Sequence, residues 1–351
     1  MDTLTHALSG ALAARATAPG KAQISTGARV IAGTLAAAFP DVDFVLAYVS
    51  PVAYLTGHRG VTHSLFVLPL WALLLAWVMA KFDRTPGVTW RDYVGVCALG
   101  VGLHIVGDLI TSFGTMLYAP FSDVRVAWGT TFIIDLWFSG IILAGLAASL
   151  VWRSSRVPAM LGLAALAGYV GFQAILRSQA LEFGAEYARR SGLSGATVTA
   201  LPRPVSPFNW AVFVTAGDRY HSANVNLVRA QPVPASGPGA GFFARFDAAY
   251  LPLAQAKWIT VDRYGGGAER ELAARTLAAP ALGFFRWFAE LPVLYRIDRG
   301  NPSTCVWFED LRFVTPGRDS SIFRFGLCNE EGSAEWRAFR LRDDGTREPA
   351  G

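Results

Sequence analysis

Residues 93–113 read YVGVCALGVGLHIVGDLITSF, an apolar run that contains one histidine, His104, and one acid, Asp108. Its length is close to the roughly 20 residues that an α-helix needs to cross the hydrocarbon core of a bilayer. Residues four apart lie on one face of a helix, so His104 and Asp108 are neighbours. Ionisable side chains are costly inside lipid, so we expect this pair to face the protein interior, either paired or bound to a metal ion. A hydrogen-bonded pair that fixes helix packing is the simpler alternative.

Further apolar segments predict an α-helical membrane domain over residues 1–178. Three of them have the length of spanning helices, namely residues 65–82, 132–152 and 157–176. Two shorter stretches, residues 4–18 and 24–48, precede them and are interpreted as a hairpin of two helices. Together with residues 93–113, these segments predict about five to six membrane helices.

Residues 179–351 have the pattern of a small soluble α+β domain with mainly antiparallel strands. Charges recur every few positions, and Pro and Gly are frequent. Two strand pairs are expected, residues 210–215 with 221–228 around Gly217-Asp218, and residues 306–314 with 322–328 around Pro316-Gly317. One amphipathic helix is expected over residues 277–291. Cys305 and Cys328 could form a disulfide if this domain faces an oxidising compartment.

The composition excludes some classes of protein. Hydrophobic residues make up 52% of the 351 positions and charged residues only 16%, which is too apolar for an ordinary soluble domain. The formal net charge is +5, but the basic residues are scattered singly, so we expect no nucleic-acid partner. Membrane lipid is the expected partner.

The distribution of Lys and Arg predicts the orientation of the helices, because basic residues in short loops favour the cytoplasmic side. One set of loops contains Arg15, Lys21, Arg29, Lys81, Arg84, Arg91, Arg153 and Arg156, and the other contains Arg59, Arg125 and Arg177. We assign the richer set to the cytoplasm. The N-terminus, residues 41–64, residues 116–131 and the C-terminal domain are then expected to face outward.

Four of the five histidines lie in the first 104 residues, each in a short polar string. The strings are Thr5-His6, Pro40-Asp41-Val42-Asp43, His58-Arg59-Gly60-Val61-Thr62-His63-Ser64 and His104-Ile105-Val106-Gly107-Asp108. Asp41 and Asp43 repel each other unless a cation neutralises them, although one of them could instead cap the following helix. Gly60 permits a tight turn that brings His58 and His63 together, although two histidines on a surface loop are a simpler explanation.

The predicted topology places all these groups near the outer face of the membrane, although it was drawn from Lys and Arg alone. Imidazole and carboxylate groups without thiolates suit divalent ions such as Zn, Mn or Fe. Seven candidate ligands exceed one tetrahedral site, so we expect a divalent metal, with two ions bridged by a carboxylate as the fuller arrangement.

These strings, continued by Thr111 and Gly114-Thr115, resemble a bacterial family of membrane-bound metal-dependent hydrolases, the LexA-regulated, YdjM-like inner-membrane proteins. The resemblance covers about residues 1–180. It implies a bacterial inner-membrane location and a metal-binding role for His6, Asp41, Asp43, His58, His63, His104 and Asp108. A weaker resemblance to the β-rich extension of longer members rests on Pro207-Phe208-Asn209-Trp210 and Phe308-Glu309-Asp310-Leu311-Arg312-Phe313.

The leading functional hypothesis is a metal-dependent hydrolase that acts on a phosphoester or lipid-linked substrate at the membrane surface. Asp43 could orient or deprotonate the attacking water. Arg59 could hold an anionic oxygen of the substrate, although a surface cation facing lipid headgroups is an equal alternative. Two other functions stay open. One is an ion or proton pathway built from intramembrane His and Asp, and the other is a non-catalytic, metal-stabilised membrane scaffold.

Overall fold

The computed structural model describes residues 1–351 except 21–22, 237–242, 301–302, 317–320, 322 and 330–334. The chain separates into two compact units. Unit 1 contains Met1–Phe44 and Gly57–Ile175, and unit 2 contains Val45–Thr56 and Leu176–Gly351. The helix α7 (Val157–Arg190) begins in unit 1 and ends in unit 2.

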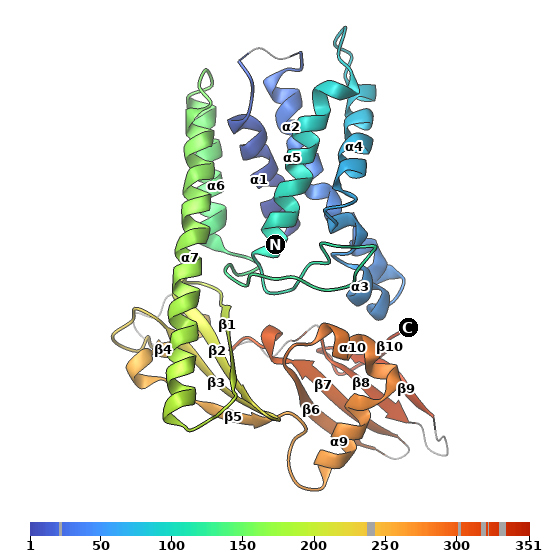
Figure 1. The fold of residues 1–351 in the computed structure, drawn as a ribbon, viewed down its shortest axis with the longest axis vertical. Helices are drawn as coiled ribbons and strands as arrows, with labels where there is room; N and C mark the ends of the chain where they lie inside the picture. The colour runs from blue at the N-terminus through green and yellow to red at the C-terminus, as the bar shows by residue number, and fades with distance from the viewer. Residues whose placement is uncertain (21–22, 237–242, 301–302, 317–320, 322, 330–334) are drawn as a thin grey trace. The chain divides into compact units, whose positions relative to one another are not determined.

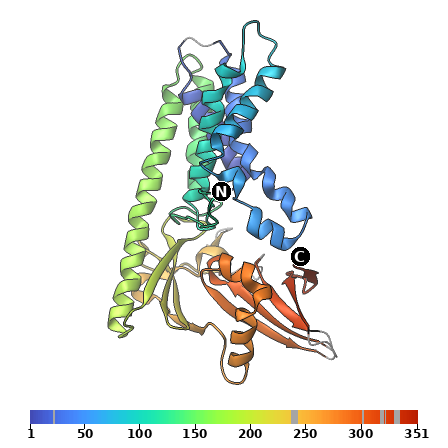
Figure 2. The same ribbon diagram turned by 45° about the vertical axis from the view of Figure 1, so that its right-hand side comes forward.

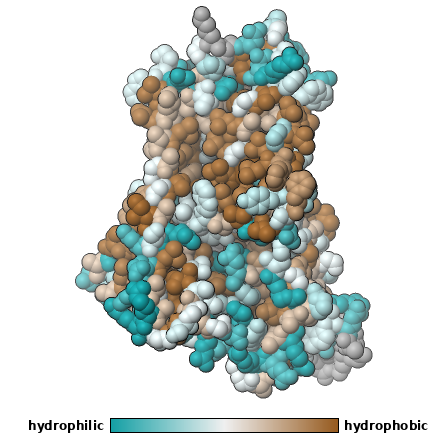
Figure 3. Space-filling view, in the orientation of Figure 1, coloured by the Kyte–Doolittle hydropathy of each residue, from teal (hydrophilic) through white to brown (hydrophobic). Residues whose placement is uncertain are grey.

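Unit 1 is a bundle of helices with the most hydrophobic surface of the chain. Its helices are α1 (Thr3–Ala16), α2 (Thr26–Ala38), α4 (Leu68–Phe82), α5 (Trp90–Leu109), α6 (Leu136–Val151) and the first part of α7 (Figures 1 and 2). Hydrophobic residues cover these helices on the face seen in Figure 3, and hydrophilic residues gather at the end where the α1–α2, α4–α5 and α6–α7 connections lie. Exposed apolar side chains of this kind suit contact with lipid.

Small residues let α1, α2 and α5 approach one another closely. A Cβ atom on Gly10 would lie 2.2 Å from the Gly33 carbonyl oxygen, and one on Gly100 would lie 2.9 Å from the same oxygen. Such contacts allow only glycine, and they are typical of helix packing in membranes, where close backbone approach replaces the hydrophobic effect. Helix α1 carries His6, helix α5 carries His104 and Asp108, and the segment with Asp41 and Asp43 follows α2 directly.

Among the described residues, three helical stretches are long and apolar enough to cross a membrane, Thr26–Tyr48, Trp90–Leu109 and Val157–Arg190, or four if the bent pair Pro51–His63 and Leu68–Phe82 is one span. The predicted count of five to six is therefore not confirmed. At 1.5 Å per residue, α1 and α6 reach only roughly 21–24 Å, short of the ~30 Å hydrocarbon core. The helical membrane character of unit 1 agrees with the prediction.

The described part of unit 2 contains two five-stranded sheets. The first consists of β1 (Thr197–Pro202), β2 (Asn209–Ala216), β3 (Arg219–Asn226), β4 (Leu251–Pro252) and β5 (Ile259–Asp262), in which β3 pairs with β2, β4 and β5. The second has the order β10 (Arg347–Pro349), β9 (Trp336–Leu341), β8 (Phe325–Asn329), β7 (Thr304–Asp310), β6 (Pro292–Arg299). All described pairs are antiparallel except β3 with β4. The expected β-rich antiparallel domain is confirmed.

Local turn signals in unit 2 were informative where Gly or Pro fixed the backbone. The β2–β3 hairpin turns at Gly217-Asp218 as predicted, with Gly217 at φ 59°.

The predicted helix over residues 277–291 is wrong. It is divided into the end of α9 (Glu269–Ala278), a 3₁₀ turn (Pro280–Leu282) and α10 (Gly283–Phe288). Pro280 disfavours helical geometry at the preceding residue, and Ala279 accordingly has ψ 142°.

The second predicted strand pair forms, but its first strand is shorter than expected. Strand β7 ends at Asp310, whose carboxylate accepts a hydrogen bond from the Arg312 amide and starts a 3₁₀ turn over Leu311–Phe313. Part of the predicted turn, residues 317–319, lies outside the described residues. Cys305 on β7 and Cys328 on β8 lie directly opposite each other and form a disulfide, with their Cα atoms 4.1 Å apart.

The disulfide predicts a simple thiol count for protein isolated from its native membrane. Denatured but unreduced protein should take up one maleimide per chain, at Cys97, and three after reduction. Replacing both Cys305 and Cys328 by Ser should lower the free energy of unfolding of unit 2 by about 3 kcal/mol, because the 23-residue loop is no longer closed in the unfolded state. Three labels before reduction would contradict the disulfide.

Candidate metal centre

The seven predicted ligand residues come together in unit 1 as one connected network. They are His6 on α1, Asp41 and Asp43 on the 3₁₀ helix η1 (Phe39–Tyr48), His58 in the following loop, His63 on η2 (Val61–His63), and His104 and Asp108 on α5. The start of α1 and the end of α5 lie at the end of unit 1 away from the α1–α2 and α4–α5 connections (Figure 1). The grouping at one level, expected from the topology, is therefore present.

A glycine on α5 makes room for His6. The rings of His6 and His104 stack with centroids 3.7 Å apart and an interplanar angle of 18°. One turn beyond His104, a Cβ atom on Gly107 would lie 3.0 Å from Cε1 of His6. The absence of a side chain at Gly107 therefore lets the His6 ring lie against α5.

Asp108 is the residue that most of the network contacts. His6 Nε2 lies 3.1 Å from Asp108 Oδ1, and His63 Nε2 lies 3.1 Å from Asp108 Oδ2. His104 Nε2 lies 3.6 Å from the same Oδ2 atom, as its i, i+4 neighbour. Asp108, His63 and His104 are each fully buried. Asp108 Oδ2 makes no hydrogen bond of good geometry within the described part of the chain, even though Arg59 Nε lies 2.8 Å away.

The contacts of the two buried imidazoles assign a proton to His104 Nδ1 and allow one on His63 Nδ1. His104 Nδ1 lies 2.6 Å from the Ala37 carbonyl oxygen, which can only accept, so this nitrogen carries the proton. His63 Nδ1 lies 2.9 Å from Thr62 Oγ1 and 3.4 Å from Asp43 Oδ2. Thr62 donates its own proton to Asp43 at 2.7 Å, so its oxygen is free to accept from His63. In the neutral rings, both Nε2 atoms then present lone pairs.

These lone pairs face each other and two carboxylates. The Nε2 atoms of His63 and His104 are 2.9 Å apart, and Asp41 Oδ1 lies 3.9 Å from the first and 3.5 Å from the second. Asp41, His63, His104 and Asp108 can each offer one ligand atom within 4.8 Å of the others. Four nitrogen and oxygen donors suit a tetrahedral divalent ion, and imidazoles held through Nδ1 by a carbonyl or carboxylate are the usual ligands of such an ion.

A second group of donors shares Asp41 with the first. Asp41, Asp43 and His58 also offer ligand atoms within 4.8 Å of one another. His58 Nδ1 lies 2.6 Å from Asp43 Oδ1, and Asp43 Oδ2 accepts from the Arg59 amide at 3.1 Å. Asp43 thus holds the His58–His63 loop in place and orients His63. Asp41 therefore belongs to both groups of potential ligands.

Arg59 is buried, so the alternative of a surface cation facing lipid headgroups is wrong. Its backbone has φ 61°, a conformation that costs a non-glycine residue about 1–3 kcal/mol and that turns the side chain inward. The guanidinium donates to Thr111 Oγ1 at 2.9 Å and lies 4.7 Å above the ring of Phe113. Arg59 Nε also lies 2.8 Å from Asp108 Oδ2, so the strained backbone brings the guanidinium into an ion pair inside the cluster.

Carboxylates outnumber the permanently charged cation in the network. Asp41, Asp43 and Asp108 contribute three carboxylates, and the Arg59 guanidinium lies against Asp108, as does the Met1 backbone nitrogen; the remaining negative charge is compensated by protons on the histidines or by a bound metal ion. An excess of negative charge in a buried cluster is costly unless a proton or metal ion compensates it. Sequence reasoning missed Met1, Thr62 and the Ala37 carbonyl, because a backbone group or a neighbouring threonine carries no motif of its own.

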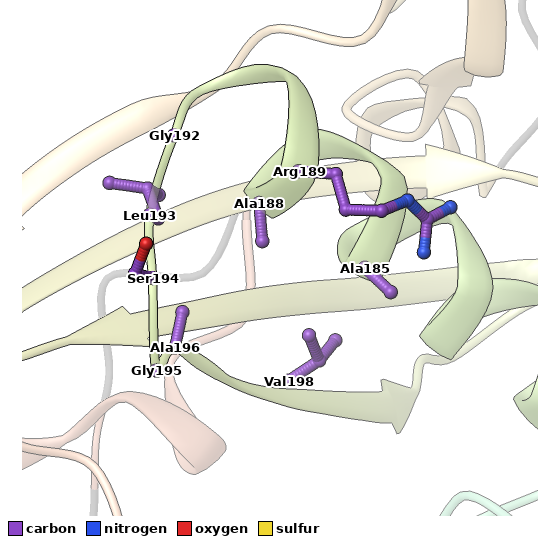
Figure 4. Close-up of a pocket in the computed structure, with 9 residues that line it drawn as sticks. All are labelled: Ala185, Ala188, Arg189, Gly192, Leu193, Ser194, Gly195, Ala196 and Val198. Carbon is purple, nitrogen blue, oxygen red and sulfur yellow. The ribbon is translucent and has the colours of Figure 1, made fainter.

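A surface pocket in unit 2 offers no comparable chemistry. Its volume is about 340 Å³, and it is lined by the end of α7, the turn that follows and the start of β1 (Figure 4). Arg189 is its only charged lining residue, and its guanidinium is already paired with Glu182 and Glu186 at 2.7 and 2.5 Å. Small residues such as Gly192 and Ala196 make up most of the rest, so the pocket is not a candidate active site.

Comparison with known proteins gives a family match over the part of the chain that holds this centre. The profile of the family described as "YdjM inner membrane protein" matches residues 1–180. A Bacillus subtilis (strain 168) protein described as "Uncharacterized protein YfhP" is 30% identical over 176 residues, which is 49% of this chain. The chain spans about half the length of that relative, 52%. No solved structure matches the chain significantly.

Removing two of the buried donors should abolish metal binding. Elemental analysis of detergent-purified protein should find one or two equivalents of a transition metal in the wild type and none in His63→Ala/Asp108→Ala, because two of the four donors around one position are lost. The exposed pair Glu182→Ala/Arg189→Ala is the matched control and should keep its metal. Absence of metal from the wild type after incubation with Zn or Mn would contradict the site.

Gly107→Ala should weaken metal binding through His6. The added methyl group would lie 3.0 Å from the imidazole and displace it from its stack on His104. We expect metal affinity to fall about 10-fold, the size of effect that residues behind the ligands usually have. Gly95→Ala on the same helix meets nothing within 4 Å and should leave affinity unchanged. Equal affinities in a chelator competition assay would show that His6 does not support the site.

Proposed function

Because the chain belongs to the YdjM inner membrane protein family, we propose that it is a membrane-bound metal-dependent hydrolase. The observation that carries the proposal is the meeting of Asp41, His63, His104 and Asp108 around one buried position. Structural metal sites usually close their coordination, whereas this cluster has more donors than one ion needs and reaches toward a more exposed edge at His58 and Asp41. A surplus of donors at this more exposed edge favours a catalytic metal site over a structural one.

Under this proposal, Asp41, His63, His104 and Asp108 hold one divalent ion, Zn or Mn by ligand type, with His6 supporting Asp108. Asp43 and His58 join Asp41 in holding a second ion. A bound ion of this kind supplies a water of lowered pKa and polarises the oxygen of the scissile bond. Under the proposal, the protein's own side chains orient the water, accept its proton and bind the anionic oxygen of the substrate.

Asp43 and Arg59 are the proposed catalytic residues. The Asp43 carboxylate lies between His58 and His63, where it can orient a water and accept its proton. Arg59 lies directly behind Asp108, so its charge reaches an anionic oxygen bound next to that carboxylate. Both residues are held by the His58–His63 loop, so one loop sets the distance between base and cation.

The proposed substrate is a phosphoester or lipid-linked molecule at the membrane surface. Two features support this choice. The cluster lies at one end of a bundle whose exposed side chains are apolar, and the ions expected there bind phosphoryl oxygens well. We also propose that this end faces the periplasm, because the Lys- and Arg-rich loops lie at the opposite end and the Cys305–Cys328 disulfide of unit 2 is typical of an oxidising compartment.

Two alternative functions, an ion or proton pathway and a non-catalytic scaffold, require different features from a hydrolase. An ion or proton pathway needs polar groups along the depth of several helices, whereas α4 has Lys81 as its only charged side chain and α6 has none. A non-catalytic scaffold would bind metal but show no effect of Asp43 beyond folding. The observations therefore favour the hydrolase.

Asp43→Asn tests catalysis separately from folding. The amide keeps the shape of the side chain but cannot accept a proton, so we expect hydrolysis to fall by at least about 10²-fold. The assay is release of phosphate or headgroup from a panel of phosphodiesters and phospholipids by the Zn- or Mn-loaded protein. Asp123→Asn, in an exposed loop position, is the control and should keep full activity. Full activity in Asp43→Asn would exclude Asp43 as the base.

A further inference from the structure

The connection between α5 and α6, residues 110–135, exposes almost only apolar side chains. The structure describes all of it, and its exposed residues are Tyr118, Pro120, Phe121, Asp123, Val124, Ala127, Trp128, Ile133 and Ile134. Asp123 is the only polar residue among them. So many exposed apolar side chains on one connection mark a surface for lipid or for another protein.

The other two charged side chains of the connection are paired inside the protein. Arg125 Nη2 donates to two backbone carbonyl oxygens at 3.1 and 2.8 Å. The Asp135 carboxylate accepts from two amides at the start of α6, both at 2.9 Å, and from the Tyr169 hydroxyl at 2.8 Å. Asp123 is therefore the only charge on the exposed surface of this connection.

Most backbone amides between residues 115 and 131 also donate to partners within the protein. Thr115 and Val126 pair with each other, with both N–O distances at 2.9 Å. The amides of Trp128, Thr130 and Thr131 donate to the carbonyl oxygens of residues 109 and 110 at 2.7, 2.8 and 3.0 Å. A non-helical segment can lie close to lipid only if its polar backbone is satisfied in this way.

The neighbouring helices place the connection at a membrane surface. Helix α5 is long and apolar enough to cross a membrane, and it ends at Leu109, where the connection begins. Helix α6 has 16 residues and needs about four more to cross the ~30 Å hydrocarbon core. Ile133 and Ile134, which are exposed directly before the cap residue Asp135, extend its apolar run. The connection runs across the end of the bundle between these two helices (Figures 1 and 2).

We propose that the α5–α6 connection lies in the headgroup layer of the membrane, with Tyr118, Phe121 and Trp128 inserted between lipid molecules. These side chains are 44%, 78% and 51% exposed. Tyr and Trp concentrate at this level of a membrane because their rings are largely apolar and carry one polar group. Lipid is favoured over a protein partner because the apolar surface of the connection continues into the apolar surface of the helices at both ends.

The metal cluster is held at the same depth as the connection. The Met116 amide donates to the Arg59 carbonyl oxygen at 2.9 Å, and the Leu65 amide donates to the Leu117 carbonyl oxygen at 3.0 Å. These two bonds flank His63 in the sequence, so the His58–His63 loop is fixed to the connection. The depth of the connection depends neither on a bound metal ion nor on hydrolysis, and its measurement tests neither of them.

The test measures the depth of a fluorophore on the connection. Full-length Val124→Cys, and separately Phe121→Cys, is labelled with a nitrobenzoxadiazole maleimide and reconstituted into vesicles of phosphatidylcholine and phosphatidylglycerol. We expect lipids with a nitroxide near the headgroup to quench the label at least about 2-fold more than lipids with a nitroxide near the chain end. Wild-type protein, in which Cys97 is buried and Cys305 and Cys328 are joined, is the blank.

Two control positions in unit 1 calibrate the quenching. A label on Leu143→Cys, at an exposed position in the middle of α6, should be quenched more by the nitroxide near the chain end. A label on Thr85→Cys, in the polar α4–α5 connection, should be quenched by aqueous iodide and by neither lipid. If the two test sites differ, Val124 decides, because the Phe121 ring also contacts Phe66, with centroids 5.3 Å apart.

Three results would overturn the proposal. Quenching by iodide as strong as that at Thr85 would place the connection in water. Stronger quenching by the deeper nitroxide would place it in the hydrocarbon core, and protection from both lipid and iodide would mean that a second copy or another protein covers it. Unmodified protein gives an independent check. A lipid with a photoreactive diazirine in its headgroup should label the peptide containing residues 118–128, as read by mass spectrometry, and absence of this label would also overturn the proposal.

Discussion

The approach of two imidazole nitrogens, His63 Nε2 and His104 Nε2, to 2.9 Å is the constraint on which the rest of the site depends. The His104 Nδ1 proton points to the Ala37 carbonyl, and when His63 likewise carries its proton on Nδ1, beside Thr62, both facing nitrogens present lone pairs. Lone pairs at this distance repel, and the nearby carboxylate of Asp108 adds negative charge. A proton on one of the two nitrogens or a metal ion among them relieves this repulsion, and the four donors around the position suit a metal ion.

The helix packing serves this geometry. Gly10, Gly33 and Gly100 let α1, α2 and α5 approach until their backbones touch, which brings the end of α2 to His104. Gly107 then admits His6 against α5. In the same way, the lack of a side chain at Gly114 leaves room for Arg125 beside Phe113. A methyl group at Gly107 or Gly114 would meet the side chain of His6 or Arg125, whereas one at Gly10, Gly33 or Gly100 would force the helices apart.

Much of the candidate site could be predicted, because its signals are local. Helix geometry is enough to predict that His104 and Asp108 are neighbours, and electrostatics is enough to predict that Asp41 and Asp43 need a cation. The distribution of Lys and Arg in the loops predicted that these four residues lie at the same depth in the membrane. The start of α6 could not be predicted, because apolar residues (132–134) precede Asp135, whose carboxylate caps the helix. Arg59 is buried with a positive φ, and Val45–Thr56 packs with unit 2, where the Val52 amide donates to the Ala350 carbonyl, 298 residues away. Neither leaves a pattern in the local sequence.

X-ray absorption spectroscopy of the metal-loaded protein tests the central claim most directly, because it reports the atoms around the ion without need of a substrate. The account predicts a first shell of about four nitrogen and oxygen atoms at about 2.0–2.1 Å for Zn, no sulfur, and the outer scattering of two imidazole rings. The outer scattering should diminish in His104→Ala. A shell of oxygen atoms alone, or one that includes sulfur, would mean that the ion does not lie between His63 and His104, and the lone-pair argument would fail.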